Sequence, residues 1–78
     1  MPISFAQQVA VKRLLMRELT AIGAGNLVLF KLIGKVDTCE DAQTLLTTLQ
    51  KAVALLVDEN AAVELTDKVR RILTTTQG

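Results

Sequence analysis

The sequence predicts an all-α fold: a small four-helix bundle with one short helix of about two turns, assembled as a homodimer. Apolar residues recur at spacings of three and four over long stretches, which is the period of one helix face. Helix-capping residues precede these stretches. Half of the residues are hydrophobic but only two are aromatic, so the core must be aliphatic, as is typical of helix bundles. With 78 residues, positions 1–78 form a single domain.

The first helix is predicted over residues 4–22. Ser4 followed by Gln7 matches the S-x-x-Q capping box, in which each side chain accepts a hydrogen bond from a backbone N–H that the first turn leaves unpaired. An apolar stripe follows, and Gly23 supplies the left-handed conformation that ends a helix. The stripe consists of Val11, Leu15, Leu19 and Ile22.

The second helix is predicted over residues 26–34, with Asn26 as its N-cap and Gly34 at its end. We expect a buried plug, because the apolar side chains of residues 27–33 point to nearly every side. A buried strand is the alternative, since periodicity alone does not separate the two for so short a run. We favour the helix because a single strand has no partner for its backbone hydrogen bonds and would require a dimer sheet. The run is far shorter than the about 20 residues of a membrane span.

The third helix is predicted over residues 38–57, where apolar residues step by three and four without a break. Two overlapping capping pairs precede it, Asp37 with Glu40 and Thr38 with Asp41. Its stripe consists of Ala42, Leu45, Leu46, Leu49, Ala52, Val53 and Leu56, with Leu55 and Val57 widening the apolar surface at the C-terminal end.

The fourth helix is predicted over residues 60–74, with Asn60 as its N-cap. No Gly or Pro enforces a break at residues 58–60, so one continuous helix is the alternative. The apolar stripe of this last segment does not continue the stripe of the third helix, which favours a break. A short connection then folds the fourth helix back antiparallel on the third. This stripe consists of Ala62, Leu65, Val69, Ile72 and Leu73. The polar tail is expected to fray from about residue 75.

Association is the predicted source of extra stability. Folding of so small a domain removes only about 60% of the surface that the unfolded chain exposes, so disulfides, metals or association usually help. Cys39 is the single cysteine and the chain has no histidine, which leaves association. The apolar arc of the first helix exceeds half its circumference, so we predict a homodimer with twofold symmetry through that helix. The candidate interface consists of Phe5, Val9, Leu15, Met16 and Leu19.

Basic side chains cluster on the first and last predicted helices, where they form one patch if those helices lie side by side. The candidate patch consists of Lys12, Arg13, Arg17, Lys68, Arg70 and Arg71. Glu18, Glu64 and Asp67 interrupt it, and the net charge is only +1, so the sequence disfavours nucleic acid as a partner. A nucleic-acid-associated regulator that uses this patch is kept as the alternative function.

The sequence predicts no catalytic, metal or cofactor site. Cys39 falls in the first turn of the third predicted helix, but there is no histidine to act as its base. Asp37, Glu40 and Asp41 are explained by capping and lack the spacing of a calcium loop. The turn at residues 23–26 completes neither glycine-rich phosphate motif. We therefore expect a protein that is not an enzyme, and the reactivity of Cys39 stays open.

The expected function is a small non-catalytic helical module for protein–protein interaction. It acts by dimerising, or by docking a partner on aliphatic helix surface. The N-terminus has no basic region before an apolar stretch, so a cytoplasmic location without membrane association is expected. The sequence predicts neither the identity of the partner nor the pathway.

Overall fold

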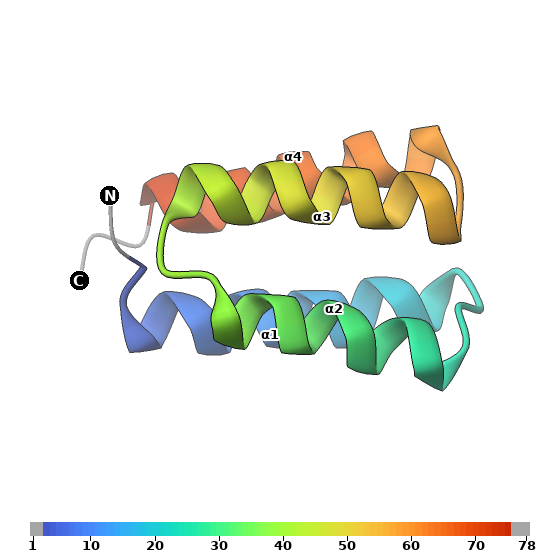
Figure 1. Cartoon of the computed structure of the whole chain (residues 1–78), viewed down its shortest axis with the longest axis horizontal. Coiled ribbons are helices and arrows are strands. Elements are labelled where there is room, and N and C mark those ends of the chain that lie inside the picture. Colours follow the sequence, from blue (N-terminus) through green and yellow to red (C-terminus); the bar gives the residue numbers. More distant parts are fainter. Residues whose placement is uncertain (1–2, 76–78) are drawn as a thin grey trace.

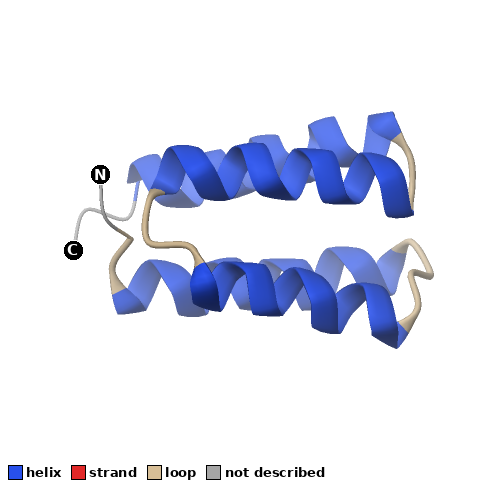
Figure 2. Ribbon diagram, in the orientation of Figure 1, coloured by secondary structure: helices blue, strands red, loops and turns tan. Residues whose placement is uncertain are grey.

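The computed structural model describes residues 3–75, and within that range the chain forms four α-helices and no β-strand. Short connections join consecutive helices (Figure 2). The helices run alternately up and down, with α1 and α2 in one layer and α3 and α4 in the other (Figure 1). The predicted all-α four-helix bundle is confirmed. The four helices are α1 (Phe5–Ala21), α2 (Asn26–Thr38), α3 (Ala42–Leu56) and α4 (Glu59–Thr75).

Each helix packs against two neighbours around a ring. Helix α1 contacts α2 and α4, and α3 contacts α2 and α4, with the α3–α4 contact the most extensive. Antiparallel neighbours joined by short loops define an up-and-down four-helix bundle. A hydrogen bond joins the first turn of α1 to the last turn of α4, because the Gln7 amide donates to the backbone carbonyl of Leu73 at 3.1 Å.

Helix α1 begins as predicted. The Ser4 hydroxyl accepts a hydrogen bond from the Gln7 backbone N–H at 3.1 Å, and the Gln7 side-chain oxygen accepts one from the Ser4 backbone N–H at 3.0 Å. The capping box is therefore confirmed. After the helix ends, Gly23 adopts a φ of 78°, the left-handed conformation that a glycine allows without steric penalty.

Helix α2 differs from its prediction. It begins with Gly25 as N-cap, so Asn26 is the first helical residue, and it continues through Gly34 to Thr38. The glycine does not end the helix because its φ stays in the helical range and because Val36, one turn beyond Leu32, continues the buried stripe. An interior glycine weakens a helix by about 1 kcal/mol but does not break it.

The interpretation of residues 27–33 as a buried plug is wrong. Only Leu32 and Val36 of α2 are buried, whereas Leu27 and Phe30 are 78% and 70% exposed. The cause is the packing of the helix, because α1 and α3 cover only one side of α2. The side chains on the other side of the run must then face solvent.

The connection between α2 and α3 also lies later than predicted. Asp37 and Thr38 are the last residues of α2, and Cys39 is its C-cap, with its backbone N–H donating to the Lys35 carbonyl at 3.0 Å. Asp41 is the N-cap of α3, since its carboxylate accepts a hydrogen bond from the Thr44 backbone N–H at 3.0 Å. Cys39 therefore lies at the end of one helix rather than in the first turn of the next.

The N-cap of helix α4 lies two residues earlier than predicted. The Asp58 carboxylate accepts a hydrogen bond from the Ala61 backbone N–H at 2.7 Å, so Asp58, rather than Asn60, is the cap. The break from α3 and the antiparallel return of α4 are confirmed, which excludes one continuous helix (Figure 1). The expected fraying of the tail concerns residues 76–78, which lie outside the described residues.

The core is closed by the four helices of one chain. All four contribute side chains to it, and every member is aliphatic, as predicted. The core closes without a second copy, but large apolar side chains remain exposed outside it, so the homodimer stays a prediction. The core consists of Val11, Leu14, Leu15, Leu19, Leu32, Val36, Leu45, Leu49, Val53, Ala62, Leu65 and Val69.

Candidate protein-binding surface

The residues of the predicted α1 interface differ in their burial. Leu15 and Leu19 are completely buried in the core of the chain, so they have no surface to offer a second copy and this part of the prediction is wrong. Phe5 and Met16 are exposed and Val9 is half-buried. Their spacing places these three on one flank of α1, away from the buried stripe.

The basic patch predicted on the first and last helices is largely neutralised within the chain. Glu18 of α1 joins two of its cations, pairing with Lys68 of α4 and, at 3.5 Å, with Arg17. The hydrogen bond from the Lys68 ammonium holds the pKa of Glu18 below its ordinary value, since the pair favours the ionised carboxylate. Lys68 and Glu18 thus link α1 to α4 instead of offering free charge.

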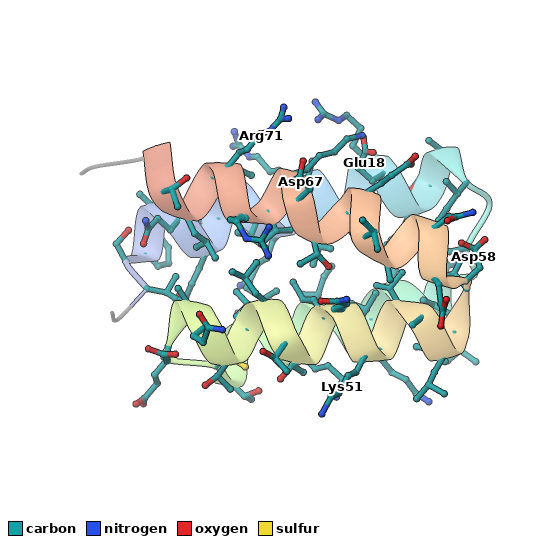
Figure 3. The ribbon with its side chains drawn as sticks, turned by 90° about the horizontal axis from the view of Figure 1, so that it is seen from above. Glu18, Lys51, Asp58, Asp67 and Arg71 are labelled. Carbon is teal, nitrogen blue, oxygen red and sulfur yellow. The ribbon has the colours of Figure 1, made fainter. Side chains whose placement is uncertain are left out.

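Other cations of the predicted patch have carboxylate partners as well. Lys12 pairs with Asp37 of α2, and Asp67 lies 3.8 Å from Arg70 and 3.5 Å from Arg71. Glu18, Asp67 and Arg71 lie on the same side of the bundle (Figure 3). Only Arg13 of the six predicted patch residues has no carboxylate partner among residues 3–75.

Large apolar side chains outside the core gather on other parts of the surface. Both aromatic residues of the chain are exposed, Phe5 at 79% and Phe30 at 70%. Leu27 belongs to the first turn of α2, and Leu55, which is 86% exposed, belongs to the last turn of α3. Figure 1 shows these two turns at the same end of the bundle. Further exposed apolar residues are Met16, Ile22, Leu56 and Val63.

A groove lies between α2 and α3. It has a volume of about 420 Å³, and we name it the α2–α3 groove. Its lining contains three lysines and no acidic residue, and none of these lysines forms an ion pair within the described part of the chain. Lys51 extends away from α3 on the side opposite Glu18 and Asp67 (Figure 3). The lining residues are Lys31, Lys35, Thr48, Lys51, Ala52, Leu55 and Leu56.

Sequence reasoning did not find the groove. Its lysines are separated along the chain by a helix connection, and only the antiparallel packing of α2 on α3 brings them together. The one feature of the sequence that pointed to this surface was Leu55, because it extends the apolar surface of its helix beyond a single stripe.

Residues 3–75 contain no group of three or more His, Cys, Asp or Glu side chains that could hold a metal ion. Cys39 is half-buried. None of the described helices is both long enough and apolar enough to cross a membrane.

The fold class is thus an up-and-down four-helix bundle with a closed aliphatic core and a basic, partly apolar groove on one side. Comparison with family models, with curated proteins and with solved structures found no match. The role of the domain must be inferred from its own residues.

Proposed function

We propose that this chain is a small non-catalytic interaction module that docks a partner protein on exposed apolar surface of α2 and α3. The observation that carries the proposal is the exposure of Leu27 and Phe30 on α2 and of Leu55 on α3, outside a complete aliphatic core. Aromatic side chains are enriched at the centres of protein interfaces, where they act as anchors. Burying a side chain such as Leu27 or Phe30 on binding stabilises a complex by about 1.5–3 kcal/mol.

Single exposed apolar residues are normal on soluble proteins. Here they are grouped, because Leu27 and Phe30 are one turn apart on α2. Leu55 and Leu56 belong to the last turn of α3, which lies at the same end of the bundle as the first turn of α2 (Figure 1). None of these four belongs to the buried core. They are therefore available for binding without any rearrangement of the fold.

Homodimerisation through the same surface is a second form of this function, but the charges favour a different protein as partner. A twofold interface places the same patch of both copies face to face. The groove of one copy, with its three lysines and no acidic residue, would then face the same groove of the other copy. Like charges brought together in this way discriminate against the complex.

The nucleic-acid-associated alternative gains no support from the geometry. Its predicted patch has carboxylate partners for all residues except Arg13 within the described residues. Binding to random duplex DNA at about 50 mM and about 200 mM salt tests this alternative, since phosphate contacts give a steep salt dependence. Absence of binding at the lower salt concentration excludes it.

The interaction function is tested by differential capture. Tagged wild-type protein is compared with a Leu27→Glu/Phe30→Glu variant and with a control, Thr20→Glu/Gln43→Glu, which adds negative side chains at two exposed positions away from the groove. Circular dichroism establishes that all three are folded. We expect at least one protein to be retained by the wild type and the control but lost from the variant.

The protein that is lost from the variant is then purified, and its binding to the wild type and the two variants is measured by calorimetry. Sedimentation of the wild type alone reports homodimerisation. Retention of the same proteins by all three forms contradicts the proposed function, as does a purified candidate that binds the Leu27→Glu/Phe30→Glu variant as tightly as the wild type.

A further inference from the structure

We propose that the α2–α3 groove binds an amphipathic helix of a partner protein whose apolar stripe is flanked by acidic residues. This inference rests on the proposed function and adds the site and the chemical class of its occupant. Three features lead to it: the shape of the groove, the charge of the groove, and a glycine on the outer side of α2.

The shape of the groove suits a helix. The groove lies between two antiparallel helices and is lined by residues from both, with Ala52, Leu55 and Leu56 supplying apolar surface. An amphipathic helix that lays its apolar face into such a groove is a recurring mode of recognition. On α3 the lining runs from Thr48 to Leu56, about 12 Å of helix, so a partner helix of about 18 residues fills the groove and reaches beyond it.

The charge of the groove selects an acidic partner. The chain has nine Lys and Arg residues, of which Lys12, Arg17, Lys68, Arg70 and Arg71 pair with carboxylates. Of the four left without an ion pair among residues 3–75, three line this one groove and only Arg13 lies elsewhere. Complementary potentials steer a partner to its site and reject partners of like charge.

Gly34 is the third feature. It lies inside α2, one turn after Phe30 and Lys31 on the same exposed side of the helix. Apart from its chain neighbours and the backbone of its own helix, a Cβ atom added at Gly34 would meet no atom within 4 Å, so packing within the chain does not require a glycine there. Glycine in a helix interior is unfavourable but permits the close approach of another backbone. A partner helix that crosses α2 at Gly34 accounts for the residue.

A protein helix fits these features better than the other occupants. A second copy of the chain would bring the same lysines against one another, as argued above. An anionic membrane would satisfy the lysines, but a flat surface does not fill a concave groove between two helices. An acidic amphipathic helix fills the groove and neutralises Lys31, Lys35 and Lys51 together.

The test uses three synthetic helical peptides of about 18 residues. The first has a leucine stripe flanked by glutamates, the second has the same stripe flanked by lysines, and the third has the glutamates with alanines in place of the leucines. Binding to the full chain is measured by fluorescence anisotropy, and the site is located by amide chemical-shift changes in NMR spectra. Vesicles of phosphatidylcholine with and without phosphatidylserine form a separate arm.

We expect the acidic leucine peptide to bind at least about tenfold tighter than either of the other two. Its shift changes should centre on Lys31, Gly34 and Lys51. A Lys31→Glu/Lys51→Glu variant should reverse the preference and bind the basic leucine peptide instead. Arg13→Glu is the control, because it reverses a cation that has no ion pair among residues 3–75 and lies outside the groove, and it should leave the preference unchanged.

Several results would overturn the inference. They are equal binding of the acidic and basic leucine peptides, absence of binding, shift changes away from the groove, or binding only to phosphatidylserine vesicles. The proposed function is judged separately by the capture experiment with the Leu27→Glu/Phe30→Glu variant. If a partner is lost from that variant but is retained by Lys31→Glu/Lys51→Glu, the interaction function stands and the assignment of an acidic helix to the groove fails.

Discussion

Helices α2 and α3 are both rich in apolar residues, but the chain uses them differently. In α3, Leu45, Leu49 and Val53 repeat at the helical period and are completely buried. In α2 the apolar residues are consecutive, so they surround the helix and only one side of it can face the core. Leu27 and Phe30 remain exposed. The spacing of apolar residues, more than their number, therefore decides how much of a helix is buried within its own chain.

Two sides of the bundle also differ in whether their charged side chains are paired within the chain. Between α1 and α4, Glu18 pairs with Lys68, so the charges are satisfied within the chain. Between α2 and α3, Lys31, Lys35 and Lys51 line a groove that contains no acidic residue. Helix α2 and the groove beside it therefore combine exposed apolar side chains with three of the four cations that have no ion pair among residues 3–75. Variants on the two sides should differ in their effect.

The largest expected effect is on the buried side of the comparison. Leu49→Ala should lower the free energy of unfolding by about 2–5 kcal/mol, because it removes completely buried methyl groups and leaves a cavity. Leu55→Ala, in the same helix but exposed, should change it by less than about 0.5 kcal/mol. Urea unfolding followed by circular dichroism measures both. Similar losses for the two variants would show that Leu55 is covered in solution.

The next effect has the opposite sign. Gly34→Ala should raise the free energy of unfolding by about 1 kcal/mol, because alanine is the better helix former and its Cβ meets no other atom. The same variant should bind the acidic leucine peptide more weakly, because the methyl group holds the partner backbone away. Thermal unfolding and anisotropy measure the two quantities on one sample.

Gly23→Ala is the matched control for Gly34→Ala. Gly23 has a φ of 78°, where a Cβ atom is strained, so this variant should lose about 1 kcal/mol of stability. If Gly34→Ala is more stable and binds the peptide unchanged, the glycine has no part in docking.

The two glycines also mark how far the sequence predicts the structure. The capping box at Ser4 and the regular stripe of α3 were sufficient to predict those helices, because local hydrogen bonds and helical period carry the information. The sequence predicted a helix end at Gly34. A glycine that ends a helix and a glycine inside one cannot be distinguished when the apolar residues around it show no helical period. The consecutive apolar run of α2 gives no phase, so its exposed side could not be predicted.

The candidate site was harder to predict than the fold. The α1 interface included Leu15 and Leu19 because a wide apolar arc does not show which part of it the neighbouring helices cover. The α2–α3 groove depends on which helices pack together, and this is set by the ring of contacts rather than by any local pattern.

A smaller effect is expected on the exposed side of α2. Phe30→Gln should change the free energy of unfolding by less than about 0.5 kcal/mol, since Phe30 is 70% exposed and does not belong to the core. Leu32→Ala, two residues later in the same helix, should lower it by about 2–5 kcal/mol because Leu32 is completely buried. Urea unfolding distinguishes them. A large loss for Phe30→Gln would place the ring inside a stable assembly.

The smallest expected effect concerns the paired charges between α1 and α4. The pKa of Glu18 is lowered in the folded state by the hydrogen bond from Lys68, against an ordinary value of 4.5. A carboxylate with a lowered folded pKa stabilises the fold above its unfolded pKa, and this contribution is lost as the pH falls through the folded pKa. Because the pair lies at the surface, solvent and salt screen it and the effect is small.

Glu18→Gln should therefore be less stable than the wild type at pH above 4.5, and the difference should shrink as the pH falls below that value. Thermal unfolding at low salt across this range measures it. Lys51→Gln is the matched change on the other side: it removes a lysine that has no carboxylate partner in the described residues, so the variant should lose no stability at any of these pH values. Equal losses for Glu18→Gln and Lys51→Gln would mean that the groove lysines are paired in solution, and the contrast between the two sides would disappear.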